Sequence, residues 1–241
     1  MKAVLRWLAG LWSTDRGLSA LLGSLVAIIF VVPALRASPA VATLVVQVLF
    51  TLVFVSGFST VIANRAARVV GIVVFTAAIA LHWLDYFNPR AGLGVWTALG
   101  RILAVSLLSV LVVRQVFGEG PITVQRIQGA VAVYLLLGLT WAGIYQLIGG
   151  VWPDAFRFSE APQSRSELTN ALAYYSFVTL TTMGYGDITP LHPAARSAGI
   201  LEALTGQLFP AILIARLVAM ELAARERGGP SRRTPVDEPR Q

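Results

Sequence analysis

Hydrophobic residues in this chain gather into six long apolar stretches, and polar or charged residues concentrate in the segments between them. Each stretch approaches the roughly 20 helical residues that cross a hydrocarbon core of about 30 Å. The stretches occupy residues 18–35, 40–63, 69–84, 92–113, 127–148 and 195–222, of which the third is the shortest. The pattern predicts an all-α integral membrane protein with six transmembrane helices.

A further apolar run, residues 168–180, is too short to span a membrane. Ser164 and Glu167 precede it with the S-x-x-E spacing of a capping box, which predicts the start of a helix. Backbone that ends at membrane depth is tolerated only where protein buries it or where it lines a water-filled cavity. We therefore expect a re-entrant helix between the fifth and sixth spans, entering from the side of the polar loop at 149–168.

The composition leaves almost no room for a soluble domain, because 56% of the residues are hydrophobic and 13% are charged. The net charge of +7 could suggest nucleic acid as a partner. Basic residues of membrane proteins gather on cytoplasmic loops, however, so we expect a lipid bilayer and no nucleic acid. The chain contains no cysteine, which excludes disulfides and thiolate metal sites.

An even number of spans puts both termini on the same side of the membrane. Placing the termini in the cytoplasm leaves only a few arginines outside, namely Arg36, Arg90, Arg157, Arg165 and Arg196. The positive-inside rule favours this orientation. Lys2 is the only lysine, and such arginine usage points to a GC-rich bacterial genome. We therefore expect a multi-pass protein of the bacterial inner (plasma) membrane with both termini cytoplasmic.

Residues 181–187, directly after the short apolar run, read T-T-M-G-Y-G-D. Gly184 and Gly186 tolerate positive φ, so alternating dihedrals can turn successive carbonyl groups toward one axis. Rings of carbonyl oxygens replace the lost hydration shell of K⁺ in selective pores. The Thr182 hydroxyl could complete the innermost ion site, while Tyr185 is free to anchor the loop outward. We interpret the segment as a selectivity-filter loop, against the alternative of a connecting loop that contains G-Y-G by chance.

The motif T-x-G-Y-G-D after a short apolar helix resembles the signature of the tetrameric potassium channel family, of the six-helix bacterial type, over about residues 127–222. The resemblance implies a homotetramer in which an outer helix, a pore helix, a filter and an inner helix from each chain surround one pathway. It implies K⁺ as the permeant ion, no organic cofactor and no enzymatic activity. The filter residues that it implies are Thr182, Met183, Gly184, Tyr185 and Gly186. Met183 stands where the family usually has Val or Ile.

The same resemblance implies that three residues support the filter, namely Tyr175, Thr181 and Asp187. Tyr175 is a candidate partner for Tyr185. Gly206 falls where the family has a hinge glycine, and Pro210 removes a helix hydrogen bond and should add a bend to a gating hinge. Alternatively, Gly206 only permits close helix packing, which is a frequent use of glycine in membranes.

Glu202 and Arg101 are ionisable residues within predicted spans, where such side chains usually have a partner or a function. We expect Glu202 to bond to the back of the pore helix, with a negative field near the cavity as the alternative. A voltage sensor needs several arginines at three-residue spacing, whereas the fourth stretch holds Arg101 and then only Arg114 at its end. We therefore expect Arg101 to snorkel or to be paired, with a gating role as the alternative, and we expect gating without strong voltage dependence.

The expected organisation is an interfacial N-terminal segment over 1–17, an uncharged four-helix transmembrane bundle over 18–115, a pore domain over 127–222 and a disordered cytoplasmic tail over 223–241. Three other functions stay open. A membrane subunit of a potassium uptake transporter would carry four degenerate filter repeats, whereas this chain has one complete motif. A nonselective cation channel often has an acid where Tyr185 stands. A scaffold without conduction would leave the motif unexplained.

Overall fold

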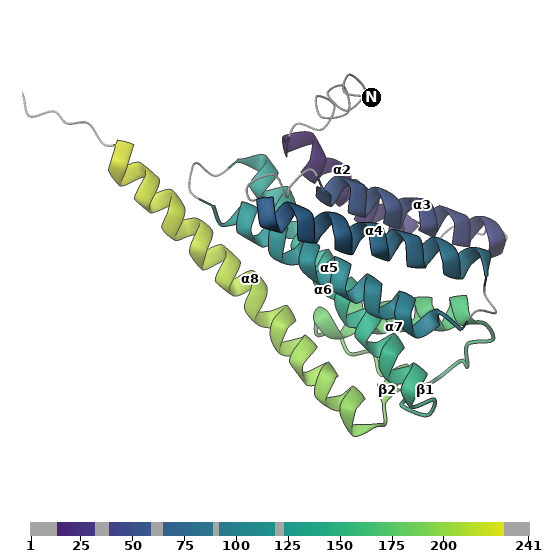
Figure 1. Ribbon diagram of the computed structural model, residues 1–241. Helices are drawn as coiled ribbons and strands as arrows, with labels where there is room; N and C mark the ends of the chain where they lie inside the picture. Colours follow the sequence, from purple (N-terminus) through teal and green to yellow (C-terminus); the bar gives the residue numbers. More distant parts are fainter. Residues whose placement is uncertain (1–13, 32–38, 59–64, 89–91, 119–122, 229–241) are drawn as a thin grey trace, which may run out of the picture.

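The computed structural model describes residues 14–31, 39–58, 65–88, 92–118 and 123–228. The expected interfacial helix at the N-terminus falls mostly in residues 1–13, which lie outside the described ranges, as does the tail from residue 229. Within the described ranges the chain is almost entirely helical (Figure 1).

The amino-terminal half forms a bundle of antiparallel helices. Its elements are α2 (Thr14–Val26), which continues as the π-helix η1 (Ala27–Val31), then α3 (Pro39–Phe58), α4 (Arg65–Phe87) and α5 (Gly94–Val116). α4 is longer than the short third apolar stretch predicted, because its helix includes flanking polar residues at both ends. The bundle packs on α6 (Val124–Val151), which starts at the N-cap Thr123.

The carboxy-terminal half holds the short helix α7 (Arg165–Leu180), the long helix α8 (Pro193–Gly228) and two short strands, β1 (Phe156–Phe158) and β2 (Ile188–Pro190). The expectation of a disordered tail from residue 223 is wrong at its start, because α8 remains helical to Gly228. Residues 223–227, A-A-R-E-R, all have high helix propensity, so the charged side chains in this segment do not end the helix.

Four described helices are long and apolar enough to cross a membrane: Val69–Phe87, Gly94–Val116, Val124–Val151 and Pro193–Leu222. Two further apolar helical stretches, Gly17–Val31 and Leu44–Val55, are shorter. The predicted helical class is thus confirmed, with four candidate membrane-spanning helices in the described ranges. The predicted first stretch runs into residues 32–38, which lie outside the described ranges.

Two apolar clusters hold the two halves together. The larger cluster joins all the helices from α2 through α6. Its fully buried side chains include Leu21, Val53, Leu108 and Leu136. The smaller cluster lies at one end of α6 and includes Tyr145, Phe156, Leu172 and Tyr175. It positions α7 and the strand pair against α6.

α8 runs along the outside of the other helices and leaves most of its surface free (Figure 1). Only 6% of its most apolar window is buried within the chain.

The antiparallel strands pair Phe156 with Pro190 and Phe158 with Ile188, which closes the long loop back onto the segment that follows the G-Y-G motif. The loop after α7 and most of α8 are therefore exposed on the single chain.

Candidate functional site

α7 begins with the capping arrangement predicted from the sequence. The Ser164 hydroxyl accepts a hydrogen bond from the Glu167 amide at 3.2 Å. The Glu167 carboxylate reaches back and accepts from the Gln163 amide at 2.6 Å. One free amide of the first helical turn and the amide of the residue before the N-cap are thus satisfied, and the start of the helix is fixed before the chain reaches the candidate loop.

The C-terminal end of α7 holds the first part of the loop through the backbone. The Thr181 and Thr182 amides donate to the carbonyls of Phe177 and Thr179 at 3.0 and 2.9 Å. The Met183 amide donates to Val178 at 3.0 Å, and the Gly184 amide donates to the same carbonyl at 3.4 Å. These bonds use the amides of the loop and the free carbonyls at the end of the helix. Within the described part of the chain, no backbone hydrogen bond occupies the carbonyl oxygens of residues 182–186.

The backbone of the loop alternates in the way that the two glycines predicted. Gly184 and Gly186 have φ of 56° and 82°. Thr182 also has a positive φ, 60°, and it is the one residue other than glycine with this property in the described ranges. A β-branched residue in this region is strained, and such strain concentrates at functional sites. The backbone therefore has a positive φ at every second residue from Thr182 to Gly186. The sequence predicted this conformation only at the two glycines.

The end of the loop is hydrogen-bonded to Ser159, the residue that follows the β1 strand. The carbonyl of Asp187 accepts from both the amide and the hydroxyl of Ser159, each at 2.9 Å. The Asp187 carboxylate accepts from the Ile188 amide at 3.1 Å. Ser159 received no role from the sequence, because its position beside Asp187 depends on the strand pairing.

The side chains of the loop face outward from the single chain. Met183 and Tyr185 are 56% and 62% exposed. Tyr175, the expected partner of Tyr185, is instead buried against Tyr145 and Phe156, with ring centroids 4.9 and 5.6 Å apart. The contact of Tyr175 with Tyr185 therefore stays a prediction.

α6 and α8 support the junction between α7 and the loop. The Tyr134 hydroxyl of α6 donates to the carbonyl of Leu180 at 3.2 Å. On α8, a Cβ added at Gly206 would lie 1.8 Å from the same carbonyl oxygen. Gly206 thus lets the backbone of α8 approach the end of α7, which favours the packing alternative for this residue. α8 is a continuous helix through Pro210.

The expected contact of Glu202 with α7 is present. Glu202 is fully buried, and its carboxyl group contacts the hydroxyls of Ser176 on α7 and Tyr145 on α6. The sequence did not single out either hydroxyl, since several tyrosines, serines and threonines lie in the same stretches. Gln207, on the next turn of α8, donates to the Thr182 hydroxyl at 3.0 Å. α8 therefore contacts both the back of α7 and the start of the loop.

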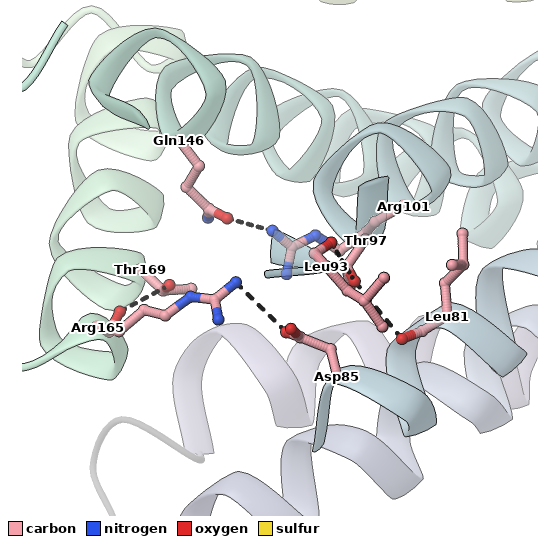
Figure 2. Close-up of polar contacts among 8 residues, drawn as sticks. All are labelled: Leu81, Asp85, Leu93, Thr97, Arg101, Gln146, Arg165 and Thr169. Carbon is pink, nitrogen blue, oxygen red and sulfur yellow. Dashed lines mark hydrogen bonds and ion pairs between the residues drawn. The ribbon is translucent and has the colours of Figure 1, made fainter. Parts of the chain in front are cut away.

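Arg101 is paired, as one of the two sequence interpretations expected (Figure 2). Its guanidinium donates to the Gln146 side chain of α6 and lies 5.9 Å from the centre of the Phe50 ring. Close by, Arg165 at the start of α7 forms an ion pair with Asp85 of α4 at 3.3 Å. This ion pair connects the amino-terminal bundle to α7 directly. This pair could not be predicted from the sequence, because the two residues are far apart in the chain.

Comparisons with known proteins agree with this arrangement. Residues 133–222 match a family model described as an ion channel, which covers part of α6, all of α7 and the loop, and most of α8. Protein LctB of Bacillus caldotenax is 36% identical over 87 residues, which are 35% of this chain and 64% of that protein. Two pore potassium channel c of Oryza sativa subsp. japonica is 36% identical over 93 residues, or 39% of this chain and 18% of that protein.

Protein LctB of Geobacillus stearothermophilus is 38% identical over 60 residues, or 25% of this chain and 44% of that protein. The chain thus covers less than two thirds of each of these three relatives. The family match, the potassium channel relative and the apolar helices support an ion channel in a membrane.

Proposed function

We propose that this chain is one subunit of a K⁺-selective channel that conducts passively and has no enzymatic activity. The observation that carries the proposal is the loop 182–186, in which φ is positive at alternate residues and the carbonyl oxygens accept no backbone hydrogen bond from the described residues. A row of carbonyls facing one axis offers K⁺ a replacement for its hydration shell. Thr182, Met183, Gly184, Tyr185 and Gly186 are the proposed ion ligands.

The electrostatics of α7 favour a cation at the inner end of this loop. The C-terminal end of a helix carries a partial negative charge, and α7 ends at Leu180 directly before the loop. In the proposed arrangement α7 is re-entrant and its end points to the middle of the membrane. The shorter apolar helices around Gly17–Val31 and Leu44–Val55 complete six spans, with both termini in the cytoplasm of a bacterial cell.

The loop of one chain supplies only one side of an ion site, so we expect four chains around one axis. Large apolar side chains of α8 stand free of the chain's own core, among them Ile200, Leu204, Leu208 and Ile212, each more than half exposed. Met183 and Tyr185 are similarly exposed and would be covered by neighbouring copies. Mass measurement of the detergent-solubilised or nanodisc-embedded protein should give four copies. A stable monomer or dimer that still conducts K⁺ would contradict the proposal.

Opening should depend only weakly on voltage. One elementary charge crossing the full field contributes about 2.3 kcal/mol per 100 mV, and steep gating needs several such charges in each subunit. Arg101 is held by Gln146 and Phe50 within the bundle, so it has little freedom to cross the field. Planar-bilayer recordings in symmetric K⁺ should give a shallow open-probability curve that persists in Arg101→Gln. A steep curve that this substitution abolishes would mean that the bundle is a voltage sensor.

The direct test of the proposed function is ion flux from liposomes that contain the purified protein and a K⁺ gradient. We expect K⁺ efflux that Ba²⁺ blocks and that Na⁺ does not replace. Equal flux of K⁺ and Na⁺ would instead indicate a nonselective cation channel. Flux that requires a second, coupled ion would indicate a transporter subunit.

A further inference from the structure

Glu202 occupies an unusual position for a carboxyl group. It lies in the apolar window of α8, and it is fully buried. Its Oε2 is 2.5 Å from the Tyr145 hydroxyl of α6, and its Oε1 is 2.5 Å from the Ser176 hydroxyl of α7. One side chain therefore connects the three helices that surround the start of the candidate filter.

The charge of the group formed by Glu202, Ser176 and Tyr145 depends on how many protons these three side chains hold. The Ser176 oxygen lies 2.5 Å from Glu202 Oε1 and also 2.7 Å from the carbonyl oxygen of Gly138 on α6. A serine hydroxyl has one proton, and a backbone carbonyl can only accept. If Ser176 donates to Gly138, the proton between Ser176 and Glu202 must come from the carboxyl group. Tyr145 then donates to the other carboxyl oxygen, and each of these short contacts contains one proton.

The surroundings of Glu202 also favour the neutral form. Within the described part of the chain, no salt bridge is formed by Glu202. The titratable groups that face it are Tyr134 and Tyr145 on α6 and Tyr175 on α7, while β2 contributes none. None of these carries a positive charge. Burying an ionised carboxylate without a cation is far more costly than burying a hydrogen-bonded carboxylic acid.

We propose that Glu202 is a protonated positioning residue, which holds α7 between α6 and α8 through the hydrogen-bonded series Glu202, Ser176 and Gly138. Ser176 lies one helical turn before Leu180, where the loop begins. A shift of α7 at this point moves the first carbonyls of the loop. The consequence for ion selectivity rests on the proposed channel function, whereas the protonation state does not.

Infrared spectroscopy of the purified protein tests the protonation state without any conduction measurement. We expect a carbonyl band of a buried carboxylic acid at neutral pH that is lost in Glu202→Gln. Glu160→Gln is the matched control, because Glu160 is exposed in the loop before α7 and its loss should leave the band unchanged. Absence of the band, or its persistence in Glu202→Gln, would overturn the proposal.

Ion flux tests the positioning role. Glutamine can donate to Ser176 and accept from Tyr145, so Glu202→Gln should retain the preference for K⁺ over Na⁺. Glu202→Ala leaves the Tyr145 hydroxyl without its acceptor and should lower that preference by about tenfold, the effect of one lost buried hydrogen bond. Flux through the parent should fall as rising pH removes the carboxyl proton, and Glu202→Gln should remove this dependence. Glu202→Gln that is as impaired as Glu202→Ala would contradict a neutral Glu202.

Discussion

Replacing Gly184 or Gly186 with alanine abolishes selective K⁺ conduction if the loop 182–186 coordinates the ion. Both residues have positive φ, and nothing lies within 4 Å of a Cβ added at either position. The damage therefore comes from the backbone itself, because the left-handed conformation costs an L-residue about 1–2 kcal/mol. Relief of this strain would turn a carbonyl group away from the axis in every subunit. Bi-ionic reversal potentials in planar bilayers measure the loss.

Gly92 provides a matched control for these two variants. Its φ of 67° is also positive, and a Cβ added there also meets nothing within 4 Å. Gly92→Ala therefore introduces the same kind of backbone strain outside the loop. We expect it to keep the parent's preference for K⁺ over Na⁺. If Gly184→Ala and Gly186→Ala keep that preference as well, the loop is not the selectivity filter.

A second large effect is expected from Gly206→Ala. The added methyl group would lie 1.8 Å from the backbone oxygen of Leu180, a distance that requires the end of α7 or α8 to move. Overpacking of this kind typically costs about 1–3 kcal/mol, and a contact with backbone has little room to relax. We expect a lower temperature of unfolding in detergent and the loss of selective flux, since the loop begins directly after Leu180.

This variant also separates the two interpretations of Gly206. If the residue were only a gating hinge, alanine would change the open probability and would not lower the temperature of unfolding, because alanine is the better helix former. Gly150→Ala on α6 is the control, since its Cβ would meet nothing within 4 Å and its backbone is helical. An unfolding temperature of Gly206→Ala equal to that of Gly150→Ala would rule out the packing role.

The parts of the structure that the sequence predicted are those governed by local chemistry. Apolar stretches of sufficient length predicted the spanning helices, and Ser164 with Glu167 predicted where α7 starts. Positive φ was expected at Gly184 and Gly186, because glycine adopts it at no steric cost. The positive φ of Thr182 was not expected, because a threonine reaches this conformation only when its surroundings force it.

The contacts that position the loop could not be predicted, since they join residues far apart in the chain. The sequence shows that Glu202 needs a partner, but it does not distinguish Ser176 and Tyr145 from the other hydroxyls of α6 and α7. The ion pair between Asp85 and Arg165 depends on how α4 packs beside the start of α7. The role of Gly206 depends on the distance between two backbones, and both alternatives were compatible with the sequence.

Direct observation of ions in the loop tests the central claim. The measurement is the anomalous density of Rb⁺, as a substitute for K⁺, in crystals of the assembled protein. We predict a row of ion sites on the symmetry axis, surrounded by the carbonyl oxygens of residues 182–186, which is lost when Na⁺ replaces Rb⁺. Absence of density on that axis, or Rb⁺ bound only elsewhere in the protein, would contradict the account.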